Sequence, residues 1–240
     1  MTNLKQLTDA VEVRGGDADA KVFLTCEHAT QRMPTGWRWP DLDRRLIDTH
    51  WAYDMGAREM THALAAGLSA PAVLSRFTRL LVDPNRDESA STLFRTHAEG
   101  HPVELNTHLL DDVERMKRMD RLWRPFHEAV DRELGQTSAP ILLAIHTFTP
   151  LYEGSRRQVE IGVLFDHEEA LAEELAAGLA ARGHRVGLNE PYSGKEGLMY
   201  VGERHAERHR RRAIELEVRQ DLAIDPLFRA ELVPLLAELL

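Results

Sequence analysis

The stretch AKVFLTCEH (residues 20–28) begins with mainly apolar residues and ends in polar ones. Its apolar part predicts a short strand over residues 21–26, because brief continuous apolar runs are typical of strands covered on both faces. The stretch PILLAIH (residues 140–146) has the same form, and a strand is predicted over residues 141–145. Each stretch ends in a histidine. Because the carboxyl ends of parallel strands meet at one edge of a sheet, we expect the two histidines to lie near each other there.

The rest of the chain alternates between helical periodicity and short apolar runs. We expect helices over residues 53–68, 107–134, 168–182 and 226–240, and strands over residues 71–74, 158–165, 184–188 and 213–218. Pro125 should kink the second helix, and residues 83–100, which show no periodicity, should form a loop. Strands that alternate with helices predict an α/β fold with a largely parallel, helix-covered sheet. We expect one domain over residues 1–240, in which residues 1–20 are loosely held.

The composition is that of an ordinary α/β domain. The chain has 240 residues, of which 43% are hydrophobic, and its formal net charge is −9. A net negative charge disfavours general binding to nucleic acid or to an anionic membrane. The only cysteine, Cys26, excludes an intrachain disulfide and fits a reducing compartment. The chain shows no signal-peptide pattern and no apolar run of membrane-spanning length, so we expect a cytoplasmic protein.

The two strand-end histidines, His28 and His146, are candidate metal ligands. Zinc in hydrolases typically takes three protein ligands drawn from histidine and carboxylate side chains, and it keeps one position for water. Asp54, at the start of the predicted helix 53–68, is the candidate carboxylate. Ordinary explanations stay open for all three residues. Histidines at strand ends can be plain hydrogen-bonding residues, and an aspartate in a first helical turn is favoured by the helix dipole alone.

An arginine-rich segment, SRFTRLLVDPNR (residues 75–86), follows the predicted strand 71–74. It contains Arg79 and Arg86, with Asp83 and Asn85 between them. The guanidinium group is a planar fork that suits bidentate binding of a carboxylate, so the segment is a candidate site for substrate carboxylates. The alternative is a solvated strand end with ion pairs.

The predicted strand 213–218 alternates between charged and apolar residues. Glu215, Glu217 and Arg219 share one of its faces, and the other face is apolar. If the charged face points into a cleft, Glu217 can take a proton from a metal-bound water and pass it to a leaving amine. The alternative is an edge strand with one face in water.

Other features carry weaker functional signals. Tyr192 lies in NEPYSGKEG (residues 189–197), a loop that could cover a site. The basic run RHAERHRRR (residues 204–212) is expected to be a solvated or substrate-facing patch, with nucleic-acid binding as the alternative. Cys26 is expected to pack in its strand rather than to act as a nucleophile. The chain has no G-x-S-x-G, G-x-G-x-x-G or P-loop motif, so a serine-hydrolase elbow and two common phosphate-binding loops are unsupported.

Six short motifs occur together in one order: CEHATQRMP, HWAYDMGA, TRLLVDPNR, LLAIHTFTP, NEPYSG and IELEVRQDL. With these motifs, over residues 22–222, the chain resembles the N-formylglutamate amidohydrolase family, in a shorter branch marked by CEHA and ELEVRQDL. The resemblance implies a three-layer α/β/α fold with a mostly parallel sheet, of the phosphorylase/hydrolase type that zinc exopeptidases share. It also implies hydrolysis of a linear amide that joins a formyl or other acyl group to an amino acid.

The resemblance further implies roles for particular residues. His28, Asp54 and His146 match metal-binding positions, with Zn²⁺ or another divalent ion as the expected cofactor, and Glu217 matches the catalytic glutamate. We expect substrate binding by Arg79, Asn85, Arg86 and Tyr192, and supporting roles for Glu27, Asp83 and Glu215. Glu27 stays open as a partner of His28 or as the carboxylate ligand in place of Asp54. The expected partner is a small acidic N-acyl amino acid, and neither nucleic acid nor a membrane.

Three other interpretations stay open. The first is an amidohydrolase of the same fold that acts on a different N-acyl amino acid or on a peptidoglycan-type peptide amide. The second is a non-enzymatic binding module on the same scaffold, and the third is an interaction protein that uses the basic run 204–212.

Overall fold

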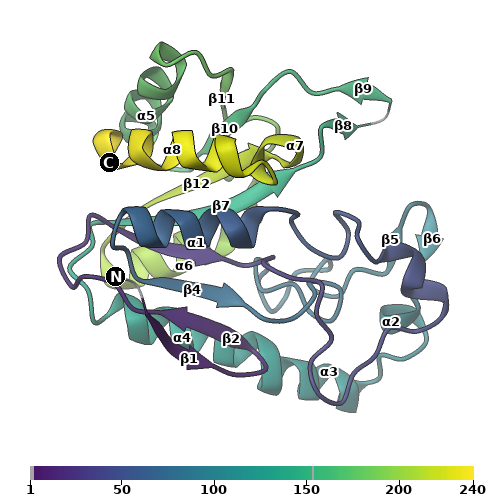
Figure 1. Cartoon of the computed structure of the whole chain (residues 1–240). Coiled ribbons are helices and arrows are strands. Elements are labelled where there is room, and N and C mark those ends of the chain that lie inside the picture. The colour runs from purple at the N-terminus through teal and green to yellow at the C-terminus, as the bar shows by residue number, and fades with distance from the viewer. Residues whose placement is uncertain (1–2, 153) are drawn as a thin grey trace.

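The computed structural model of the protein describes residues 3–152 and 154–240, and an eight-stranded sheet forms its centre (Figure 1). The strand order is β1 (Leu4–Leu7), β2 (Val11–Arg14), β4 (Ala72–Ser75), β3 (Val22–Cys26), β7 (Ile141–Phe148), β12 (Arg212–Arg219), β10 (Ile161–Leu164) and β11 (Val186–Leu188). The pairs β4–β3, β3–β7, β7–β12 and β10–β11 are parallel. The pairs β1–β2, β2–β4 and β12–β10 are antiparallel. The prediction of a mostly parallel sheet is confirmed.

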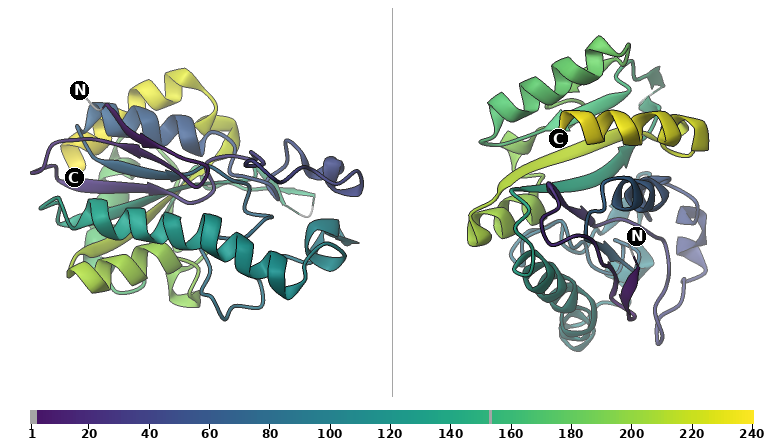
Figure 2. Two further views of the ribbon diagram at one scale, coloured as in Figure 1. Left: turned by 90° about the horizontal axis from the view of Figure 1, so that it is seen from below. Right: turned by 60° about the vertical axis from the view of Figure 1, so that its left-hand side comes forward.

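Helices cover both faces of the sheet. On one face lie α1 (Ala57–Gly67), α5 (Glu169–Ala181), α7 (Gln220–Ala223) and α8 (Pro226–Leu239), and on the other lie α4 (Arg124–Leu134) and α6 (Tyr200–His209). The left view of Figure 2 shows these layers, with blue α1 and yellow α8 on one side of the strands and teal α4 and green α6 on the other. This is the predicted three-layer α/β/α arrangement.

Strand alternation explains why the core divides into two parts. Successive side chains of a strand point to opposite faces of its sheet. In β3, Leu24 therefore packs in one cluster of buried residues, together with Leu64 of α1. Phe23, its neighbour in the chain, packs in a second cluster with Phe126 of α4. The apolar run that predicted the strand is continuous because both of its faces are covered.

Short elements connect these layers. They are η1 (Leu42–Leu46), α2 (Glu104–Thr107), α3 (Asp112–Arg118), η2 (Met119–Trp123) and η3 (Gly194–Glu196), with the two-residue pairs β5 (His97–Ala98)/β6 (His101–Pro102) and β8 (Leu151–Tyr152)/β9 (Ser155–Arg156). Within the described residues, no helix combines the length and the apolar character that crossing a bilayer requires.

The predicted helix 107–134 is the main error in the secondary structure. It is divided into α2, α3, a wide π-helical turn at Met119–Trp123, and α4. Pro125 lies in the first turn of α4 and has no N–H to give to the preceding turn, so the chain widens before it instead of kinking within a continuous helix. Val113, an apolar residue within the predicted helix, is 76% exposed.

Two further expectations need correction. Residues 1–20 are not uniformly loose, because Val11–Arg14 forms the mostly buried strand β2, which pairs with β4. The helix predicted over residues 53–68 begins at Ala57, so Asp54 lies before the helix and not in its first turn. The helix dipole therefore does not account for this aspartate.

Candidate active site

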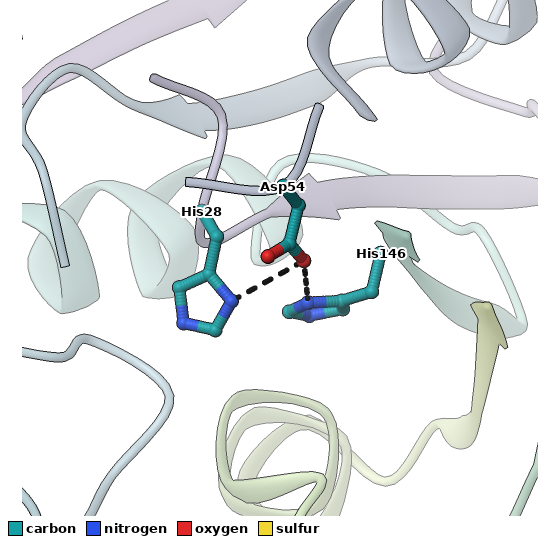
Figure 3. Close-up of side chains that lie close together, drawn as sticks. All are labelled: His28, Asp54 and His146. Atoms are coloured by element: carbon teal, nitrogen blue, oxygen red, sulfur yellow. Dashed lines mark hydrogen bonds and ion pairs between the residues drawn. The ribbon is translucent and has the colours of Figure 1, made fainter. Parts of the chain in front are cut away.

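The two strand-end histidines lie together with Asp54 (Figure 3). His28 follows β3 by two residues, whereas His146 lies inside β7, because that strand continues past its predicted end. Asp54 lies in the turn before α1, and its backbone N–H donates to the carbonyl of His28 at 2.9 Å. Gly56 ends this turn at φ +85°, and a Cβ there would lie 2.8 Å from the backbone of Ala223. The turn is therefore confined between β3 and α7, which determines where Asp54 points.

The Nδ1 atoms of both imidazoles face one carboxylate oxygen. Asp54 Oδ2 lies 2.9 Å from His146 Nδ1 and 3.4 Å from His28 Nδ1. The ring centroids are 4.8 Å apart, with 74° between the ring planes. One ligand atom of each residue lies within 4.8 Å of those of the other two. Two imidazole nitrogens and a carboxylate oxygen are a ligand set of hydrolytic zinc sites, so these side chains fit a divalent metal.

Each imidazole also has a carboxylate at its far nitrogen. Asp83 Oδ1 lies 2.7 Å from His28 Nε2. Glu27 Oε2 lies 2.8 Å from His146 Nε2, although these two atoms are not aligned as a hydrogen bond. Outer carboxylates of this kind set the tautomer and orientation of metal-binding histidines. Since Glu27 lies at the nitrogen of His146 that does not face Asp54, the geometry favours Asp54 as the carboxylate ligand.

Several buried carboxyl groups lie close to the two histidines. The carboxyl groups of Glu27, Asp54, Asp83, Glu215 and Glu217 belong to residues that are at most 5% exposed. The basic side chains in contact with them are His28, His146 and Arg79. Buried charges are normally paired or bound to a metal, because an unpaired one is costly. A divalent cation between the histidines is compatible with these carboxyl groups.

Burial and neighbouring charges separate the carboxyl groups into two kinds. Burial opposes the ionisation of Asp54, but His28 and His146 outweigh it and hold the pKa of Asp54 below its ordinary value. Burial raises the pKa of Glu215 to about 7 and the pKa of Glu217 well above its ordinary value. Asp54 is thus ionised, as a metal ligand must be, and Glu217 is able to hold a proton, as a general acid must.

Arg79 is held by carboxylates. Its Nε and Nη2 donate to Asp83 Oδ2 at 3.1 and 2.6 Å, and its Nη1 lies 3.6 Å from Asp54 Oδ1. Burial lowers the pKa of Arg79, but Asp83 and Asp54 outweigh it and raise that pKa. Its positive charge is therefore largely balanced by carboxylates of the chain.

Asn85, Arg86 and Tyr192 line the same cavity of about 340 Å³ as the histidines. The side-chain amide of Asn85 is occupied at both ends, because Nδ2 donates to the carbonyl of Leu198 at 3.0 Å and Oδ1 accepts from the N–H of Val201 at 3.1 Å. Asn85 thus anchors its neighbour Arg86 to the start of α6, and it also lines the cavity.

Gly162 makes room for the loop that carries Tyr192. It pairs with Glu217 across β10 and β12, and a Cβ on it would lie 2.1 Å from the carbonyl oxygen of Glu190. The loop therefore passes closely over β10 and brings Tyr192 into the cavity wall. There the hydroxyl of Tyr192 accepts from Arg157 Nη1 at 3.4 Å.

The cavity wall also contains residues that the sequence analysis did not select. They carry aromatic or polar side chains and are His50, Trp51, Arg95, Thr147, Phe148, Thr149 and Tyr152. Trp51 stands three residues before Asp54 in the motif HWAYDMGA, so its position in this motif could have indicated that it lies at the site. Arg95 lies in the loop 83–100, where no sequence periodicity shows which side chains face the interior. Loops held by a rigid scaffold nevertheless often carry binding residues.

Two features of the sequence lie outside this cavity wall. Cys26 is fully buried, and burial raises the pKa of its thiol, so it packs in its strand and is not an activated nucleophile. In the basic run 204–212, Arg208 pairs with Asp131 of α4 at 3.1 Å, and part of the charge of the run is balanced locally.

Comparison with known proteins agrees with this geometry. The model of the N-formylglutamate amidohydrolase family matches residues 20–224. The chain belongs to this family. As an N-formylglutamate amidohydrolase family member it is an amidohydrolase, and its fold has close counterparts among solved structures.

The first of these counterparts is a gene product of Agrobacterium tumefaciens. It is 31% identical to this family member, with a TM-score of 0.87 over 97% of this chain and 93% of that chain. The N-formylglutamate amidohydrolase from Ralstonia eutropha JMP134 is 17% identical, with a TM-score of 0.68 over 97% of this chain and 96% of that chain. At this identity the second likeness shows the fold alone. The search of curated proteins found no match.

Proposed function

We propose that the chain is a metal-dependent amidohydrolase that removes a formyl or other acyl group from the nitrogen of a small acidic amino acid such as glutamate. The observation that carries this proposal is the group formed by His28, Asp54 and His146, whose ligand atoms lie within 4.8 Å of one another in a cavity wall. The buried carboxyl groups around them are compatible with a bound cation. The arginines of the same wall support an acidic substrate.

Each step of the reaction has a group in place. His28, Asp54 and His146 would hold Zn²⁺ or another divalent ion, which supplies Lewis-acid stabilisation of negative charge on the scissile carbonyl. Glu217 pairs in register with His146 across β12 and β7, and it lines the cavity. It accepts a proton from the attacking water and returns it to the leaving nitrogen.

Arg79 completes the site. Two of its nitrogens donate to Asp83, and the third, Nη1, faces Asp54. A fixed guanidinium beside the metal ligands can stabilise the oxyanion of the tetrahedral intermediate without reorganising. Asp83 thus orients both Arg79 and the imidazole of His28.

The test combines metal analysis with a substrate panel. Bound metal is measured in the purified protein, and hydrolysis of N-formyl, N-acetyl and longer N-acyl amino acids is measured with and without a chelator. We expect bound metal and chelator-sensitive hydrolysis, and His146→Ala should lose both. The control is His167→Ala, whose side chain is 88% exposed and should be dispensable. Full metal content and turnover in His146→Ala would end the metal proposal, and a protein that cleaves no member of the panel would favour the binding module.

A further inference from the structure

Three arginines line the active-site cavity, and their charges are balanced to different degrees. They are Arg79, Arg86 and Arg95. Arg79 is paired with Asp83 and faces Asp54. Over residues 3–152 and 154–240, neither Arg86 nor Arg95 has a carboxylate within ion-pair distance. The cavity therefore presents two cationic groups that form no ion pair with a carboxylate of the described chain.

The backbone at Arg95 is held in place by a buried network. Its carbonyl accepts a hydrogen bond from Asn106 Nδ2 at 2.9 Å. The Asn106 Oδ1 in turn accepts from Arg118 Nη1 at 2.7 Å, and Arg118 is only 1% exposed. Although Arg95 belongs to a long irregular loop, its Cα position is thus set by bonds to the region of α2 and α3.

The guanidinium group of Arg95 is oriented by an aromatic ring. Its central carbon lies 5.2 Å from the centroid of the Trp51 ring. Stacking on a ring satisfies one face of the guanidinium and leaves the N–H groups at its edge free for a planar acceptor. Burial and the nearby charges of Arg79 and Arg86 lower the pKa of Arg95, so an anion bound there would relieve a repulsion.

We propose that Arg95, stacked on Trp51, is the specificity-determining residue that binds the side-chain carboxylate of an acidic N-acyl amino acid, while Arg86 takes its α-carboxylate. The proposal rests on the function proposed above. An amino acid with two carboxylates needs two separate cationic anchors, and Arg86 and Arg95 are two such groups in one cavity of about 340 Å³. A substrate with a neutral side chain would leave the Arg95 guanidinium without a counter-charge in a partly dehydrated wall, and the enzyme would discriminate against it.

The test compares two substrates that differ only in this charge. N-formylglutamate and N-formylglutamine have the same shape, and kcat/KM is measured for both. Replacing Arg95 by Gln should lower kcat/KM for the glutamate substrate roughly 100-fold and change that for the glutamine substrate less than about threefold. Arg95→Lys should be intermediate, because it keeps the charge and loses the fork. The control is Arg115→Gln, since Arg115 also lies over an aromatic ring, Phe94, but does not line the cavity.

A second measurement separates this proposal from the proposed reaction. Calorimetry compares binding of glutarate, a dicarboxylate without an amide, with binding of butyrate. The wild-type protein should prefer glutarate, and Arg95→Gln should lose that preference whether or not the protein cleaves amides. Equal losses of kcat/KM for both substrates, or an unchanged preference for glutarate in Arg95→Gln, would overturn the assignment of Arg95. Wild-type protein that cleaves neither substrate but prefers glutarate would instead refute the proposed reaction and keep the carboxylate site.

Discussion

Asp83→Asn should weaken metal binding although Asp83 is not a proposed ligand. Its Oδ1 accepts from His28 Nε2 at 2.7 Å and from the N–H of Asn85 at 3.0 Å, and its Oδ2 accepts from Arg79. All of these partners are donors. An asparagine of the same shape must turn its NH₂ group toward one set of donors, so it cannot replace the carboxylate at both oxygens.

The expected size follows from these contacts. Loss of an outer carboxylate typically weakens metal binding about 10- to 100-fold, which corresponds to about 1.4–2.7 kcal/mol. Since Asp83 orients Arg79 as well as His28, we expect the upper part of this range. The dissociation constant for Zn²⁺ is measured by competition with a chromophoric chelator. The control is Asp120→Asn, which removes a carboxylate that is 56% exposed and pairs with Arg124, and which should leave metal affinity unchanged. An unchanged dissociation constant in Asp83→Asn would refute the role assigned to this carboxylate.

Three further predictions concern other parts of the molecule. Glu217→Gln should retain bound metal but lower kcat about 10²- to 10⁴-fold, because it removes the proton acceptor and not a ligand; near-normal kcat with normal metal content would exclude that role. Asn85→Ala should lower the stability to urea by about 1–3 kcal/mol, since it leaves the buried N–H of Val201 and the part-buried carbonyl of Leu198 without this partner; unchanged stability would contradict the anchoring role. Burial opposes ionisation of Asp131, but His205, His209 and Arg208 outweigh it and lower its pKa to about 2. The stabilisation by this carboxylate is therefore present above its unfolded pKa of about 4 and is lost as the pH falls toward 2. Asp131→Asn should cost about 1 kcal/mol at neutral pH, after allowance for solvent screening, and the difference from wild type in urea unfolding should vanish near pH 2; a difference that persists there would show another origin.

Local patterns predicted most of the elements, because their causes are local. The apolar runs at β3 and β7 are continuous since both faces of these central strands are covered, and that can be seen in a short window. The same reasoning placed His28 and His146 at one edge of the sheet. Pro125 correctly indicated that the helix is irregular near this residue. Whether a helix kinks or widens depends on the elements that it packs against, and a short stretch of sequence does not reveal them.

The roles within the site depended on contacts between distant segments. The sequence shows that Glu215 and Glu217 share a face, but that Glu217 pairs with His146 follows only from the adjacency of β12 and β7. In the same way, the sequence left open whether Arg79 binds a substrate carboxylate or forms ion pairs, and only the folded chain shows that it pairs with Asp83 and Asp54. Patterns indicate which side chains can do chemistry, whereas the charge that each one retains is a property of its neighbours in space.

The two faces of β12 differ in what burial of their side chains contributes to stability. On one face, Leu216 and Val218 pack in the core and stabilise the sheet by burial. On the other, Glu215 and Glu217 are buried near further carboxylates, and burial raises the pKa of both. Apolar residues at these two positions would stabilise the fold more than buried carboxyl groups do. Departures from local stability of this kind concentrate at functional sites, and a cation bound there, as we propose, would also stabilise the fold.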